Sequence, residues 1–123
     1  MNDTVLIEQV TEWIYEADPG LLERYGEQGK DKCRQDNRHH LDHLRTAYEL
    51  RDERIFADYA VWLDGILRSH GMTTQLLIDN FMLLQKAIDE CLDVAETERK
   101  AYGGYLAKGI SVLQERDARE VSV

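Results

Sequence analysis

The sequence predicts an all-α fold, arranged as a four- to five-helix bundle or a globin-like helical domain with a long C-terminal helix. The chain of 123 residues contains one proline and few β-branched residues, and both features favour helices over strands. Apolar residues also recur with helical spacing from end to end. The length fits one domain, which we expect to cover residues 1–123.

The N-terminal part predicts one helix from about Thr4 to Ala17, with Val10 on a broad apolar face. The triplet Asp18-Pro19-Gly20 then breaks this helix. A short helix over Leu21–Tyr25 is expected next, ending at Gly26 because glycine commonly terminates helices.

The middle of the chain predicts two further helices. The first runs from about Lys30 to Leu50. Its inward stripe is Cys33, Asn37, His40, Leu41, Leu44, Ala47 and Tyr48. Asp52 is a suitable N-cap for the second helix, which ends near Gly71. This second helix has the heaviest aromatic content, so we expect it to be the most buried element.

The C-terminal third begins with Thr73 or Thr74 as a cap, followed by an apolar stripe that reaches Ala95. The pair Gly103-Gly104 is expected to kink or break the chain. A final helix would cover Tyr105–Arg116, and residues 117–123 are expected to be a frayed tail.

A continuous helix from Thr74 to Arg116 is the alternative arrangement of this third. At 1.5 Å per residue it would be about 60 Å long. That length exceeds the width of a compact domain of this size. Such an overhang would need a partner, most simply a second copy of the chain, so we predict a homodimer.

Charge and apolar content limit the classes of partner. The net charge is -9, from 24 acidic and 15 basic residues. Binding to nucleic acid or to an anionic membrane needs a basic patch, and the basic residues here are scattered. No apolar run approaches the ~20 residues of a membrane span, and no signal peptide is visible. We expect a cytoplasmic protein, with Cys33 and Cys91 as reduced thiols.

One predicted helix carries a conspicuous cluster of potential metal ligands, namely Cys33, Asp36, His39, His40 and His43. Asp36 and His40 are four residues apart, and His40 and His43 three apart, so each pair shares a helix face. Imidazole and carboxylate groups at such offsets can ligate zinc or iron. Asp36, His40 and His43 are therefore candidate ligands for a transition metal or a tetrapyrrole.

Two other interpretations of the cluster stand beside this one. His40 falls within the apolar stripe, which is typical of a core histidine held by a hydrogen bond to Asp36 one turn earlier, with His39 and His43 in solvent. A pH-sensing role is the third interpretation, because histidine titrates near neutrality. Across the helix pair, Asp36 or His40 is also a candidate partner for the hydroxyl of Tyr59.

Catalytic signatures are weak. Ser69 beside His70 lacks the context of a nucleophile elbow. Neither cysteine has a basic setting that favours a thiolate. The sequence therefore leaves enzymatic activity uncertain and favours a non-catalytic role.

Two groups of residues resemble a helical segment found ahead of cobalamin-binding domains in bacterial regulatory proteins. The positions are Arg24-Tyr25-Gly26, Lys32-Cys33, Asp36, His40-Leu41, Leu44, Ala47, Phe56, Asp58-Tyr59, Trp62-Leu63, Leu67 and Gly71. The resemblance spans about Leu21–Ile88 and implies a sensory or interaction module. The chain departs from that setting because it has no cobalamin-binding domain and no Asp-x-His-x-x-Gly loop, so no ligand residue is carried over.

These observations lead to two functional hypotheses. The leading hypothesis is a non-catalytic, homodimeric sensory or protein-interaction module in bacterial regulation. Its working surface would be the long C-terminal helix and the acidic exterior. The alternative is a helical bundle that binds a metal or a tetrapyrrole through Asp36, His40 and His43.

Overall fold

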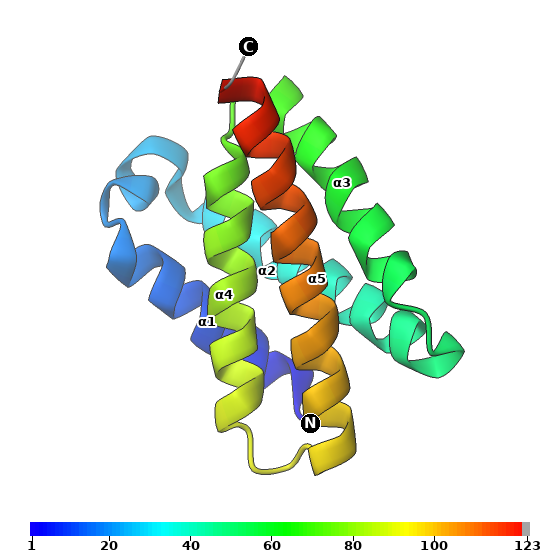
Figure 1. The fold of residues 1–123 in the computed structure, drawn as a ribbon. Coiled ribbons are helices and arrows are strands. Elements are labelled where there is room, and N and C mark those ends of the chain that lie inside the picture. Colours follow the sequence, from blue (N-terminus) through cyan, green and yellow to red (C-terminus); the bar gives the residue numbers. More distant parts are fainter. Residues whose placement is uncertain (122–123) are drawn as a thin grey trace.

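The structure, a computed structural model, describes residues 1–121 (Figure 1). Its helices are α1 (Asp3–Ala17), α2 (Gly20–Leu50), α3 (Glu53–Ser69), α4 (Thr74–Glu90) and α5 (Glu96–Val121). No strand occurs in this range. The predicted all-α class with a long C-terminal helix is confirmed.

Side-chain caps fix where three of these helices begin. The Asn2 carboxamide oxygen accepts from the backbone N–H of Val5 at 3.2 Å. Asp52 accepts from the N–H of Arg54 at 3.0 Å, and Thr73 from that of Leu76 at 3.2 Å. Each cap satisfies one N–H group that has no partner within its helix. Asp52 is confirmed as a cap, and Thr73 is the one of the two candidate threonines that caps α4.

Gly26 interrupts α2, as its sequence position predicted. Its backbone angles are φ 65° and ψ -166°. This φ lies in a region that residues with a Cβ rarely adopt. The chain is helical on both sides of Gly26, and the interruption gives residues 20–25 a different direction from the rest of α2 (Figure 1).

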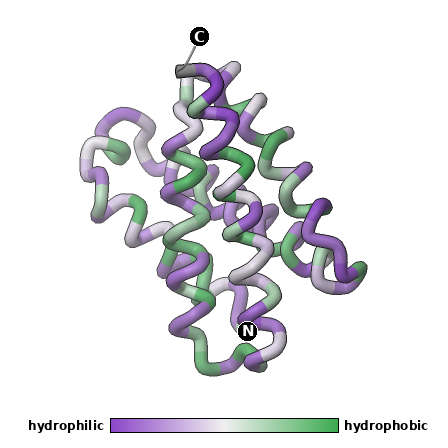
Figure 2. Tube along the Cα trace, in the orientation of Figure 1, coloured by the Kyte–Doolittle hydropathy of each residue, from purple (hydrophilic) through white to green (hydrophobic). Residues whose placement is uncertain are grey.

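Helices α4, α5 and α3 lie side by side, and α1 and α2 cross behind them (Figure 1). The consecutive helices α3 and α4 contact each other less extensively than either contacts α5, because α5 lies between them. Apolar residues alternate with polar ones along every helix (Figure 2). The residues of the core that are at most 1% exposed are Val10, Leu41, Leu44, Ala47, Phe56, Ala60, Ile78, Phe81, Leu84, Ile88, Leu106 and Leu113.

The break near the C-terminus lies at residues 91–95 and not at Gly103-Gly104. Both glycines lie inside α5. The turn before α5 is held by Arg99, whose guanidinium donates to the carbonyl oxygens of Cys91 at 2.6 Å and of Val94 at 3.2 Å. The prediction of a final helix starting at Tyr105 was therefore wrong, because two glycines cost a helix less than the packing of the longer α5 provides.

This turn also removes the basis for the predicted overhang. Helices α4 and α5 run antiparallel (Figure 1), so the 60 Å helix from Thr74 to Arg116 does not form. The overhang from which a homodimer was predicted is therefore absent, and the homodimer stays a prediction. Of the expected tail, residues 117–121 continue α5 and residues 122–123 lie outside the described part of the chain.

The aromatic helix α3 is buried on one side only. Phe56 is fully buried and Tyr59 is 7% exposed, whereas Trp62 is 62% exposed. We expected α3 to be the most buried element, and this expectation was wrong because Trp62 is largely exposed. None of the helices within residues 1–121 combines the length and the apolar content needed to cross a membrane.

Candidate functional site

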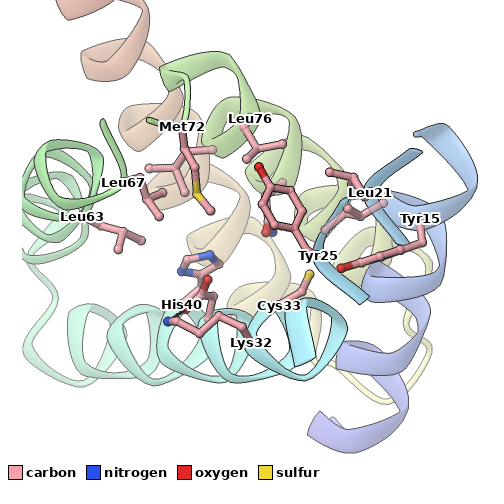
Figure 3. A pocket seen from close by; sticks show the side chains of 15 residues that line it. Tyr15, Leu21, Tyr25, Lys32, Cys33, His40, Leu63, Leu67, Met72 and Leu76 are labelled. Atoms are coloured by element: carbon pink, nitrogen blue, oxygen red, sulfur yellow. Dashed lines mark hydrogen bonds and ion pairs between the residues drawn. The ribbon is translucent and has the colours of Figure 1, made fainter. Parts of the chain in front are cut away.

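A cavity of about 220 Å³ lies among α1, α2, α3 and α4 and is partly open to solvent (Figure 3). Most of its surface is apolar. The apolar side chains that line it are Ile14, Leu21, Leu63, Leu67, Met72, Leu76 and Leu77. The polar or aromatic side chains are Tyr15, Tyr25, Lys32, Cys33, Asp36, His40 and Asn80. An apolar hollow with a few convergent polar groups is typical of a small-molecule site.

The interruption of α2 forms one side of this cavity. It places Leu21 and Tyr25 opposite the side chains of α3 (Figure 3). Gly29 permits this arrangement, because a Cβ at that position would lie 2.4 Å from the Cβ of Tyr25. The turn between α3 and α4 contributes Met72, and the start of α4 contributes Leu76. Segments distant in sequence therefore surround one hollow.

His40 projects from α2 toward the buried end of the cavity (Figure 3). It is 1% exposed, and its Nδ1 lies 2.7 Å from the hydroxyl of Tyr59 on α3. The ring of Phe81 on α4 meets it edge to face, with centroids 5.0 Å apart. Burial, with smaller contributions from His39, His43 and Lys32, lowers the pKa of His40 from 6.5 to about 3. His40 is thus a neutral core histidine at physiological pH.

The partner of His40 differs from the one that helix spacing suggested. Asp36 bonds Lys32 at 2.7 Å, so it does not hold the imidazole of His40. Of the two candidate partners for Tyr59, the structure selects His40. Tyr59 and His40 lie on different helices, and the hydrogen bond ties α2 to α3.

His43 lies beside Tyr59 and does not face Asp36 or the cavity. Its ring stacks on that of Tyr59 with centroids 3.7 Å apart, and its Nδ1 contacts the backbone carbonyl of His39 at 2.8 Å. Asp36 therefore pairs with Lys32, while His40 and His43 both contact Tyr59. Within residues 1–121, no three or more His, Cys, Asp or Glu side chains gather in a metal-binding arrangement.

A tetrapyrrole does not fit the cavity at its present size. A volume of about 220 Å³ lies below the ~300–1000 Å³ of sites that hold drug-sized ligands. It exceeds the ~150 Å³ of a cavity that binds benzene. The enclosed space therefore suits a molecule with one ring.

A pair of amides joins α2 to α4 at the edge of the cavity. Asn37 is fully buried and donates to the carboxamide oxygen of Asn80 at 3.2 Å, and Asn80 donates back at 2.7 Å. Asn37 also donates to the backbone carbonyl of Cys33 at 3.0 Å. Burial raises the pKa of the Cys33 thiol, so this cavity residue is a protonated thiol at neutral pH.

A second hollow, of about 360 Å³, lies between α1 and the end of α4 and is more open. Its polar lining residues are Asn2, Gln9, Glu90, Cys91 and Asp93, and none of them is buried. The first cavity differs because the fully buried His40 reaches it. We therefore take the first cavity as the candidate site.

The sequence indicated His40, Asp36, Cys33 and the apolar stripe of α2, but it did not indicate the wall formed by α4. Asn80 was a readable signal, since it lies three residues after Leu77 and four before Leu84, on the inward face of α4. A polar residue at such a position predicts a buried partner. Met72, in a turn, carried no comparable signal.

Comparisons with known proteins find no counterpart. No family model matches the chain, and neither the curated proteins nor the solved structures contain a match. None of the three comparisons identifies a cobalamin-associated module.

Proposed function

We propose that this protein is a non-catalytic sensory module that binds a small, largely apolar molecule in the cavity among α1, α2, α3 and α4. The observation that carries the proposal is the cavity itself, which is apolar, partly open and larger than the space that holds benzene. Folded proteins pack densely and contain few voids larger than a water molecule. A hollow of this size, reached by the buried side chain of His40, is best explained by a ligand.

The chemistry of the lining favours binding over catalysis. Lys32 and Asp36 neutralise each other at 2.7 Å, and Asn80 is engaged by Asn37. The nucleophilic atom in the lining is the sulfur of Cys33, and its raised pKa keeps it protonated. The lining therefore offers a ligand an apolar surface with few groups that could react with it.

A ligand in this cavity would act by linking segments of the fold. The walls come from the first half of α2, the α3–α4 turn and three other helices. A ligand that contacts all of them binds only when they are assembled, and it stabilises the folded state by RT ln(1 + [L]/Kd). Such a molecule would tighten the position of residues 20–29 against α3 and α4, which is a signal that a partner protein can recognise.

Toluene is a suitable probe because it is apolar and has one ring. We expect saturable binding that shifts the NMR signals of the lining residues and raises the melting temperature.

Met72→Trp should weaken toluene binding at least fivefold, because the side chain of Met72 points into the cavity (Figure 3). Met82→Trp is the matched control, since Met82 is 47% exposed and lies outside the lining. Unsaturable binding, or equal affinity in the two variants, would overturn the proposal.

A further inference from the structure

His40 has one ring nitrogen without a protein partner at the buried end of the cavity. Its Nδ1 is engaged by Tyr59 at 2.7 Å, and Tyr59 does not line the cavity. Its Nε2 makes no hydrogen bond within residues 1–121, although the residue is 1% exposed. Nε2 is not among the fully enclosed side-chain atoms that lack a partner, so it keeps an opening to the cavity, from which a ligand can supply its partner (Figure 3).

The proton on the imidazole can be placed by counting donors. The hydroxyl of Tyr59 is one donor, and its contact with Nδ1 is its single hydrogen bond in the described chain. If Nδ1 carried the proton, the hydroxyl hydrogen of Tyr59 would have no acceptor. If the hydroxyl donates to Nδ1, Nε2–H is the one group of the pair left without a partner, whereas a proton on Nδ1 would leave both the hydroxyl hydrogen and the lone pair of Nε2 without one. A neutral imidazole has one N–H group, so the remaining hydrogen is on Nε2.

The other polar groups near the buried end already have protein partners and offer a ligand few hydrogen bonds. Asn80 exchanges hydrogen bonds with Asn37, and Lys32 is paired with Asp36. Because Lys32 neutralises the Asp36 carboxylate, this pair offers a ligand no net charge. Tyr25, which is 51% exposed, lies at the open side. The buried end therefore presents one neutral donor within an apolar wall.

We propose that the ligand is a neutral, mainly apolar molecule with one hydrogen-bond acceptor, a carbonyl or ether oxygen, which accepts from Nε2–H of His40. This inference rests on the proposed function and specifies the chemical class of the ligand. The acceptor enters first and the apolar part fills the space toward Tyr25 and Leu76. A neutral acceptor suits the site because its burial is matched by one hydrogen bond.

The first measurement is the tautomer of His40 in the ligand-free protein. Long-range ¹H–¹⁵N NMR of the ¹⁵N-labelled chain separates protonated from unprotonated ring nitrogens. The signals of His40 are assigned by their loss in the double variant His40→Leu/Tyr59→Phe, which removes both partners together and leaves no orphaned hydroxyl. We expect a protonated Nε2 and an unprotonated Nδ1. The reverse pattern would overturn the inference.

The second measurement compares acetophenone with α-methylstyrene, which has the same shape but a methylene group in place of the carbonyl oxygen. Acetophenone should shift the Nε2 signal of His40 more than α-methylstyrene does. The ratio of their affinities, acetophenone over α-methylstyrene, should fall about 3- to 10-fold in the double variant, the value of one neutral hydrogen bond. An unchanged ratio would show that the acceptor does not contact His40.

The toluene experiment keeps the two proposals distinguishable. Toluene has no acceptor, so its binding tests the cavity without His40. Two outcomes would overturn the ligand class and leave the cavity function intact. In the first, toluene binds and the affinity ratio is unchanged in the double variant. In the second, toluene binds and acetophenone does not. Failure of all three compounds to bind would overturn the proposed function, and the ligand class with it.

Discussion

The carboxylate of Asp64, on α3, is fully buried and lies 3.4 Å from Nε of Arg116 on α5. Its second oxygen, Oδ1, has no hydrogen-bond partner within residues 1–121. The side chain of Arg116 is 38% exposed. The charge of Asp64 is therefore compensated by one cation at a long distance. Arg116 is partly solvated and depends less on Asp64 than Asp64 depends on Arg116.

Removing Arg116 should cost more than removing the charge of Asp64. Arg116→Met leaves a buried charge without compensation, and we expect a loss of about 1–3 kcal/mol, below the full value for a buried pair because Arg116 is partly solvated. Asp64→Asn should cost less, and the double variant should be more stable than Arg116→Met alone. Urea denaturation measures all three, with Lys108→Met on the exposed side of α5 as control. Equal losses for the two single variants would contradict this.

The amide pair between Asn37 and Asn80 should contribute measurably to stability. Asn80→Ala leaves the fully buried carboxamide of Asn37 without its partner on α4. Orphaning a buried amide costs about 1–3 kcal/mol. The exposed Gln114 on α5 supplies the control, because Gln114→Ala removes an amide that is solvated. Chemical denaturation that places both variants within a few tenths of a kcal/mol would contradict a role for the pair.

Sequence periodicity was sufficient for the helical class, two caps and the interruption at Gly26, because these depend on local chemistry. It was insufficient for the turn at residues 91–95. That turn depends on Arg99, which reaches back to the carbonyl oxygens of Cys91 and Val94. No local pattern encodes such a contact. The kink expected at Gly103-Gly104 does not form, because the packing of α5 outweighs the low helix propensity of the two glycines.

The candidate site was predictable only in part for the same reason. Helix spacing placed His40 on an inward face, and that position is confirmed. Spacing within α2 cannot decide between Asp36 on the same helix and Tyr59 on α3 as its partner, because the choice depends on how the helices pack. Trp62 shows the converse. Its apolar character suggested burial, yet no helix of the described chain covers it sufficiently.

Substitution of alanine for two glycines of α5 should change the stability of the protein in opposite directions. At Gly104 a Cβ would meet nothing within 4 Å, so Gly104→Ala should stabilise the protein by about 0.5–1 kcal/mol through helix propensity. At Gly109 a Cβ would lie 2.9 Å from Cε2 of Phe56, a fully buried ring packed on Phe81. Gly109→Ala should therefore destabilise it by about 1–3 kcal/mol. Thermal denaturation of both variants checks the pair, and a shift of the same sign in both would contradict this packing.

The low pKa of His40 should make the protein less stable as the pH falls from 7 to 5. Its pKa is about 3 in the folded state and 6.5 as an ordinary value, so between these values the unfolded chain binds more protons and stability rises with pH. The expected loss from His40 between pH 7 and pH 5 is about 2 kcal/mol. Hydrogen bonds from Arg45 and Arg54 lower the pKa values of Asp3 and Asp52. The stability that these two carboxylates contribute is therefore lost only at more acidic pH.

Urea denaturation at pH 5, 6 and 7 measures the pH dependence of stability, and the variant His40→Leu/Tyr59→Phe should lose most of that dependence. A pH dependence that is the same in both proteins would assign it to other groups and contradict a buried, neutral His40.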